Sequence, residues 1–133
     1  GSGVLIALGE SSCGLHESAR VIDYLARESA GQCGPCVHGL RAIADLVGEL
    51  ADGVAHPREA EHVRRWTAEI RGRGACHHPD GAARFVESAL SVFADELVSH
   101  QQRGCAGRPP SLPVGNGAAT AAGAWRAGGS ARA

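Results

Sequence analysis

Apolar residues recur at steps of three and four between Val37 and Ala51, and this spacing restricts the stretch to an amphipathic helix. Pro35 suits the first turn of such a helix, because the N–H that proline lacks would have no partner there. Asp52 and Gly53 end the pattern with residues typical of a helix terminus. We therefore predict a helix that begins near Pro35 and buries one apolar face.

Three other segments repeat this pattern, beginning near Ser12, Pro57 and Asp80. Ser11 or Ser12 is expected to cap the first of them, and Asp80 the last. The expected inward residues are Leu15, Ala19, Ile22, Leu25 and Ala26, then Ala60, Val63, Trp66 or Thr67, and Ile70, then Phe85, Val86, Ala89, Leu90, Phe93 and Leu97. Four helices with short connections most economically form an antiparallel bundle.

Both ends of the chain differ from this pattern. Residues 4–8 are a short aliphatic run followed by turn residues, which predicts one β-strand within residues 1–11. A lone strand has nothing to pair with, so we expect it to complete a sheet outside this chain or to dock on a partner. Residues 104–133 are rich in Gly, Ala, Pro and Ser without periodicity, which predicts a disordered tail. The expected fold class is all-α, with a four-helix bundle over residues 12–103.

Charge and hydropathy exclude several classes of partner. The chain has 13 basic and 14 acidic residues, a net charge of -1, so it offers no excess of positive charge for nucleic acid. Its longest apolar run, residues 4–8, is too short for direct membrane insertion and lacks the pattern of a signal peptide. Five cysteines, an odd number, favour a metal or redox site in a reducing compartment over a disulfide framework. A cytoplasmic location is expected.

Three cysteines fall in loops that an antiparallel bundle brings to one end. Cys33 and Cys36 lie between the first two predicted helices, and Cys76 lies between the last two. A Cys-x-x-Cys pair can bind a soft metal or form a reactive dithiol. Adding Cys76 makes one three-thiol site.

The residue types leave three interpretations open beside an iron-sulfur site. Cys-Gly-Pro-Cys is also the tetrapeptide of thioredoxin-like proteins, but those need a strand before the motif, and here a helix and a Gly-containing loop precede it. Cys33, Cys36 and Cys76 with His77 or His78 would complete a Cys₃His zinc set. Alternatively, the three cysteines are inert reduced thiols in an apo interaction domain.

The order of these features resembles the C-terminal iron-sulfur domain of the flavoprotein (F) subunit of NADH:quinone oxidoreductase, respiratory complex I. The shared features, over about residues 1–100, are Gly-x-Gly before the aliphatic run, a helix ending Arg-Glu-Ser, Cys-x-Pro-Cys-x-x-Gly and a distant lone cysteine. The resemblance implies a four-helix bundle that holds a 4Fe-4S cluster as an electron-transfer module. The family's loop reads Glu-Ser-Cys-Gly-x-Cys-x-Pro-Cys. Cys33, Cys36 and Cys76 match its second, third and fourth ligands, whereas Ala30 stands at the first.

The alanine leaves one iron of a cubane cluster without a thiolate. That iron would take His77, His78, Cys13, a partner's residue or solvent, or it would be absent and leave a 3Fe-4S cluster. Ser29 precedes the ligands and is either a hydrogen-bond donor to a cluster sulfide or part of a polar pair at a helix end. Cys13 and Cys105 are otherwise expected to be bystanders, and the other histidines expected at solvated positions are His16, His56, His62 and His100.

The resemblance also implies partners. In the family, NADH and FMN bind an N-terminal α/β domain, and the predicted strand would close a β-grasp domain that follows it. Neither domain is expected within these residues, and the sequence has no Gly-rich phosphate loop that opens a helix after a strand. We therefore expect a relay that is not catalytically complete alone. It would take electrons from a flavin-bearing NADH-binding domain or subunit, with FMN held there, and pass them to a downstream iron-sulfur or quinone-reducing partner. Through these partners it would lie at the inner face of a membrane.

Overall fold

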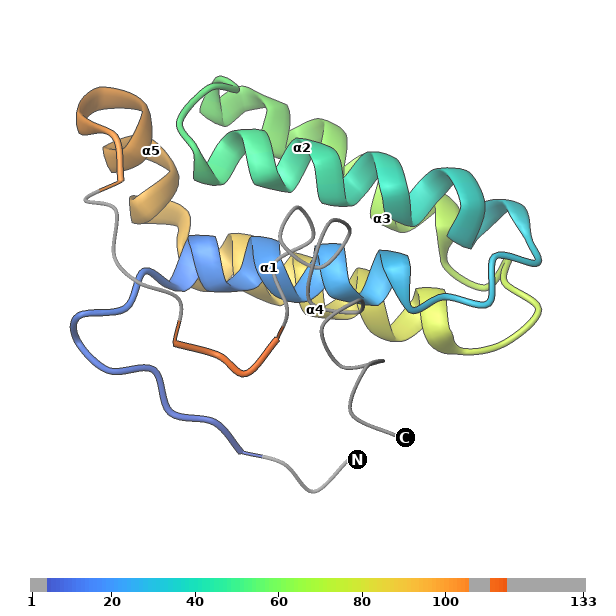
Figure 1. The fold of residues 1–133 in the computed structure, drawn as a ribbon. Coiled ribbons are helices and arrows are strands. Elements are labelled where there is room, and N and C mark those ends of the chain that lie inside the picture. Colours follow the sequence, from blue (N-terminus) through green and yellow to red (C-terminus); the bar gives the residue numbers. More distant parts are fainter. Residues whose placement is uncertain (1–4, 106–110, 115–133) are drawn as a thin grey trace, which may run out of the picture.

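The computed structural model of the chain describes residues 5–105 and 111–114. Helices alternate with short loops, and the longer ones lie roughly along one axis (Figure 1). The elements in order are α1 (Gly14–Arg27), a π-helical turn η1 (Pro35–Leu40), α2 (Arg41–Ala51), a 3₁₀ turn η2 (Pro57–Glu59), α3 (Ala60–Ile70), α4 (His78–Val92) and α5 (Ala94–Arg103).

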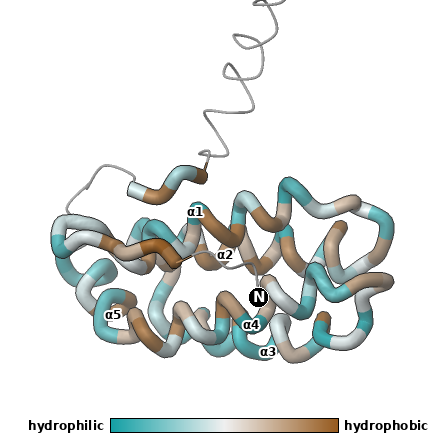
Figure 2. The backbone as a smooth tube through the Cα atoms, turned by 90° about the horizontal axis from the view of Figure 1, so that it is seen from below, coloured by the Kyte–Doolittle hydropathy of each residue, from teal (hydrophilic) through white to brown (hydrophobic). Residues whose placement is uncertain are grey.

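The core lies where the apolar faces of the first four α-helices meet. Helix α1 packs against α2 and α4, and α3 packs against α4 and α2. Of the two alternative inward residues predicted for α3, Thr67 is buried, and Trp66 is partly buried against the core. Figure 2 shows hydrophobic and hydrophilic residues alternating along the helices, as amphipathic packing requires. The large side chains with almost no exposed surface are Leu15, Ile22, Leu40, Ile43, Leu50, Val63, Thr67, Pro79, Val86 and Leu90.

The predicted N-terminal strand is wrong. Residues 5–8 have no regular structure, and no strand occurs anywhere in the part of the chain that the structure describes. The aliphatic side chains there lie outside the core, with Leu5 and Ile6 exposed. A strand is stabilised by ladder hydrogen bonds to a neighbour, and the described residues offer none. The aliphatic composition by itself therefore does not make a strand, and the prediction for Val4 lies outside the described residues.

The single helix predicted after Asp80 is in fact two helices, so the described chain has five α-helices rather than four. Helix α4 begins at His78, two residues before the expected cap. It ends at Phe93, whose backbone dihedrals, φ −103° and ψ 28°, depart from the helical region, and α5 starts one residue later. The change of direction packs α5 against the end of α2 and buries Leu97 and His100.

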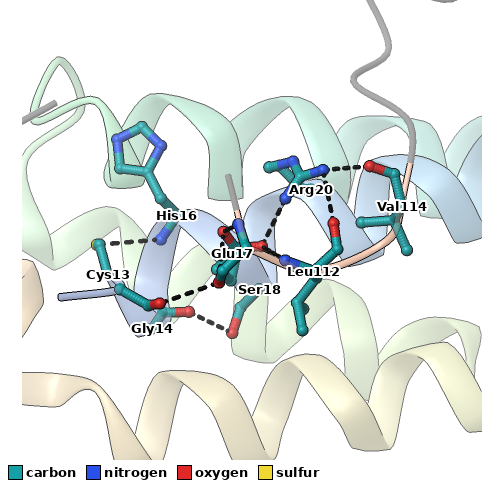
Figure 3. A network of polar contacts seen from close by, with 10 residues as sticks. Cys13, Gly14, His16, Glu17, Ser18, Arg20, Leu112 and Val114 are labelled. Atoms are coloured by element: carbon teal, nitrogen blue, oxygen red, sulfur yellow. Dashed lines mark hydrogen bonds and ion pairs between the residues drawn. The ribbon is translucent and has the colours of Figure 1, made fainter. Parts of the chain in front are cut away.

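A short segment from the C-terminal region packs on α1. Glu17, buried within α1, accepts hydrogen bonds from the backbone N–H groups of Ser111 (2.7 Å) and Leu112 (3.2 Å). Arg20 pairs with Glu17 at 2.6 Å and donates to the backbone carbonyls of Leu112 and Val114 (Figure 3). The predicted disordered tail otherwise lies outside the described residues, apart from Gly104 and Cys105.

The α1–η1 loop and the α3–α4 loop lie at the same end of the helices, on the right of Figure 1. The turn η1 touches α1, α3 and α4, so it brings the first loop into the middle of this end. Among the described helices, none is both long and apolar enough to cross a membrane.

Candidate metal centre

The Cys33–Cys36 loop is a tight turn that leads directly into a helix. The carbonyl of Cys33 accepts hydrogen bonds from the N–H groups of Cys36 (3.1 Å) and Val37 (3.0 Å). Gly31 precedes the turn with φ +61°, a left-handed conformation that glycine adopts without strain. The helix that follows begins with the π-helical turn η1, a form that is often found at functional sites. Cys36 is buried at its start, whereas Cys33 is half-buried.

The Cys76 loop is shaped by close contacts of small residues. A Cβ atom at Gly74 would lie 2.4 Å from Cγ of Pro79, so the loop can close against α4 only with glycine there. Asp80 does not cap α4 as expected but accepts a hydrogen bond from the Gly72 N–H at 2.8 Å. Cys76 itself is exposed. The loop thus presents its thiol at the surface of the same end of the bundle.

Direct electrostatic contacts connect the two loops. The backbone N–H of Ala75, next to Cys76, donates a hydrogen bond to the Cys33 thiol and lowers the pKa of that thiol. Burial raises the pKa of Cys36, and the negative charges of Cys33 and Cys76 raise it further. Cys33, Cys36 and Cys76 are therefore near enough to influence one another. The α1–η1 loop and the α3–α4 loop converge, as the antiparallel topology predicts.

Ser29 lies between the end of α1 and Cys36. Its hydroxyl donates to the Ala26 carbonyl at 2.9 Å and is within hydrogen-bond reach of the Cys36 thiol, whose pKa it lowers against the raising effect of burial. The side chain is thus both a helix-end polar residue and a neighbour of a thiol.

The two adjacent histidines have different surroundings. Nε2 of His78 donates to the Leu25 carbonyl at 2.8 Å and so ties the start of α4 to the end of α1. The side chain of His77 is fully exposed, and its Nδ1 lies 3.5 Å from the Asp80 carboxylate. The structure therefore places His78 in a structural contact and leaves the imidazole of His77 in solvent beside Cys76.

The spacing of the thiols bears on the kind of metal centre. Three sulfurs on one tetrahedral zinc ion lie about 3.8 Å apart, given Zn–S bonds of about 2.3 Å. In the described residues, the set of three such ligand atoms within 4.8 Å of one another is formed by Cys13, His100 and Cys105, and not by the loop cysteines. The thiols of Cys33 and Cys36 are within hydrogen-bond reach of each other, but the three loop thiols as a set do not meet this spacing.

The sequence analysis did not predict the group formed by Cys13, His100 and Cys105. His100 was expected to be solvated but is buried, and Cys13 caps α1, accepting the N–H of His16 at 3.3 Å. Burial raises the pKa of the Cys13 thiol to about 12. Cys13 lies at the opposite end of α1 from the cysteine loops, so it is not a fourth ligand for them. The signal in the sequence was only that His100 falls on the helix face of Leu97.

A helical bundle that gathers thiols from two loops at one end has an arrangement typical of cysteine-ligated metal proteins. The sequence model of the NADH-ubiquinone oxidoreductase-F iron-sulfur binding region matches residues 16–100, and the chain belongs to this family. Its cofactor is an iron-sulfur cluster, and the domain is an electron-transfer module.

Individual relatives agree with the family match, and three of them are F subunits of NADH-quinone oxidoreductase. The one from Rhizobium meliloti (strain 1021), numbered 2 in that organism, is 29% identical over 106 residues, which is 79% of this chain and 25% of the relative. The one from Streptomyces coelicolor is 28% identical over 106 residues, which is 79% of this chain and 24% of the relative. The one from Rickettsia typhi is 31% identical over 97 residues, which is 73% of this chain and 23% of the relative. The chain spans about a quarter of the length of the curated relatives it matches.

Proposed function

We propose that Cys33, Cys36 and Cys76 bind a 4Fe-4S cluster through which single electrons pass between a flavin-bearing NADH-binding domain or subunit and a further iron-sulfur or quinone-reducing partner. The observation that carries the proposal is that two distant loops meet at one end of the bundle and bring three thiols near enough to influence one another. An iron-sulfur cluster supplies reversible one-electron chemistry when bound. FMN belongs, in this proposal, to the partner or to a domain outside these residues.

The surroundings of the three thiols suit this role. Cys36, buried within η1, would anchor the inner side of the centre, while Cys76 would hold its outer side at the surface. The Ala75 N–H stabilises negative charge on Cys33, and the Ser29 hydroxyl would do the same for Cys36 after turning from the Ala26 carbonyl. Such hydrogen bonds to ligand sulfurs tune reduction potential. The exposed side, around Cys76 and His77, is where we place the docking of the partner that exchanges electrons.

For the position left open by Ala30 we propose His77. Its imidazole is exposed, adjacent to Cys76 in sequence, and held only by the long contact to Asp80 among the described residues. His78 is a weaker choice, because ligation through Nε2 would break its bond to the Leu25 carbonyl. A 3Fe-4S cluster is the expected species when His77 is removed.

The cellular setting follows from the same partners. We propose that residues 12–103 act as the cluster domain and that residues 1–11 lead into it from a β-grasp domain of a longer or partner chain. The assembly would be cytoplasmic and would meet the inner face of a membrane through its other subunits.

Anaerobic reconstitution with iron and sulfide tests the proposal. We expect close to four irons and four sulfides per chain and a cluster signal by electron paramagnetic resonance after reduction, both lost in Cys36→Ser. His77→Gln should give the signal of a three-iron cluster, whereas His38→Gln, an exposed imidazole at the same end of the bundle, should not. Stoichiometric zinc with neither iron nor sulfide would overturn the electron-transfer function and favour a bundle with a structural zinc site.

A further inference from the structure

A second group of metal-ligating side chains lies at the end of the bundle opposite the cysteine loops. Cys13 immediately precedes α1, His100 lies in α5, and Cys105 follows α5. Their ligand atoms all lie within 4.8 Å of one another. Helix α1, about 20 Å long at 1.5 Å per residue, separates this group from the loop that carries Cys33. The two groups are therefore independent sites.

The spacing of the ligand atoms is close to that around one tetrahedral ion. Sγ of Cys13 lies 3.4 Å from Nε2 of His100 and 3.3 Å from Oε2 of Glu96. Zinc bonds of about 2.3 Å to sulfur and about 2.1 Å to nitrogen or oxygen place such pairs about 3.6 Å apart. Small movements of Cys13, His100 and Cys105 would admit the ion, whereas the Glu96 carboxylate, which is not within 4.8 Å of all three, would have to move further.

His100 is already oriented as a ligand. Its Nδ1 lies 2.6 Å from the Ala51 carbonyl, which can only accept, so Nδ1 carries the hydrogen and the lone pair is on Nε2, facing Cys13. A backbone carbonyl on the other ring nitrogen is the usual support of a metal-bound histidine. The end of α2 reaches this position because Gly53 lacks a side chain: a Cβ there would lie 2.5 Å from the His100 carbonyl oxygen.

Glu96 and the surrounding cavity complete the arrangement. Oε2 of Glu96 accepts the Leu15 N–H at 3.1 Å, which fixes the carboxylate at the start of α1 beside Cys13. The group borders a cavity of about 530 Å³ that opens to solvent and is lined also by Ser12, Ser99 and Arg103. An ion thus has both a route in and an oxygen donor for a fourth position.

We propose that Cys13, His100 and Cys105, with Glu96 as the fourth ligand, form a zinc-type metal site. Two thiolates, an imidazole and a carboxylate make a donor set suited to a tetrahedral, borderline-soft divalent ion. On binding, the ion replaces the two thiol protons, which pass to solvent. The site cross-links the start of α1 to the end of α5 and to the chain beyond it. It does not depend on the iron-sulfur proposal.

The test uses the full chain with its loop thiols removed. In Cys33→Ser/Cys36→Ser/Cys76→Ser, kept reduced and free of iron, titration with Co²⁺ should give one bound ion per chain with thiolate-to-metal charge-transfer absorption. Zn²⁺ should displace the Co²⁺ and raise the melting temperature. Adding Cys105→Ser or His100→Gln should raise the Kd for Zn²⁺ at least about tenfold. Cys105 lies outside the helices, so its replacement should leave the helical circular dichroism unchanged.

Gln102→Ala, an exposed change in the last turn of α5, is the matched control and should leave the Kd for Zn²⁺ unchanged. If the loop-thiol variant does not fold, the same comparison is made in the natural chain, where Cys105→Ser should remove one zinc ion per chain. Failure of the folded loop-thiol variant to bind Co²⁺, or an unchanged Kd on adding Cys105→Ser, would overturn the proposal.

Discussion

Ala30 lies in the exposed loop between α1 and η1, three residues before Cys33, and its carbonyl accepts a local hydrogen bond from the Gln32 side chain. The resemblance to the family's F subunit places a cysteine ligand at this position. Nothing in the packing of the loop requires alanine, because the residue is exposed and lies outside the core. In the proposed cluster site, the residue would therefore change the number of ligands without changing the fold.

Ala30→Cys should restore a fourth thiolate. We expect iron per reconstituted chain to rise toward four in the background of His77→Gln, with loss of the three-iron signal, because an added thiolate can bind the remaining iron. Iron and sulfide analysis with electron paramagnetic resonance makes the measurement. Gln32→Cys adds a thiol to the same loop outside the motif and serves as the control. Equal iron content in both variants would show that the position is not a ligand position.

At the scale of elements, the break between α4 and α5 has an identifiable cause. Phe93 ends α4, and its ring packs where a side chain at Gly14 would otherwise lie: a Cβ there would be 2.0 Å from Cε1 of Phe93. The aromatic ring thus fits against the backbone of α1. From this point α5 runs toward the end of α2, where it brings His100 to the Ala51 carbonyl.

Replacing Gly14 should destabilise the fold although alanine favours helices. Gly14→Ala forces the Phe93 ring to move, which we expect to cost about 1–3 kcal/mol of unfolding free energy. Gly48→Ala in α2 meets no atom within 4 Å and should stabilise by about 0.5–1 kcal/mol. Urea unfolding of the two variants measures both effects. A stabilised Gly14→Ala chain would contradict the close packing of the Phe93 ring on Gly14.

At the scale of the whole molecule, contacts between segments far apart in the sequence hold the fold together. The end of the bundle with Cys33 and Cys76 joins two loops, and Ser111–Val114 returns to cover α1 through Glu17 and Arg20. Burial would raise the pKa of Glu17, but the N–H groups of Ser111 and Leu112, with Arg20, outweigh it and lower that pKa below its ordinary value of 4.5.

A lowered pKa in the folded state predicts a loss of stability in acid. The contribution of Glu17 is complete above about pH 4.5 and should disappear as the pH falls through the lower folded-state pKa. We expect hydrogen exchange of the Leu112 amide to be slow at about pH 6 and, after correction for intrinsic exchange rates, to be much less protected at about pH 3. Glu17→Gln should lower the unfolding free energy by about 2 kcal/mol at neutral pH and remove most of this pH dependence.

Glu61→Gln is the control for this experiment, because Glu61 is an exposed carboxylate whose ion pair with Arg64 lies on the surface. It should leave the protection of Leu112 unchanged. If Leu112 is equally protected in acid and at neutral pH, Glu17 does not hold the segment.

The sequence by itself determined the helices and the meeting of the cysteine loops. Apolar periodicity fixes which residues face inward, and short connections fix antiparallel neighbours, so the sequence alone assigns Cys33, Cys36 and Cys76 to one end of the bundle. Only the tertiary structure decided the rest. The N-terminal strand fails for want of a pairing partner, and the helix after His78 breaks because Phe93 packs on Gly14. The cluster of Cys13, His100 and Cys105 depends on where α5 turns. The spacing of apolar residues along the sequence encodes which side chains are buried. Contacts between distant segments depend on how the helices pack together, which that spacing does not record.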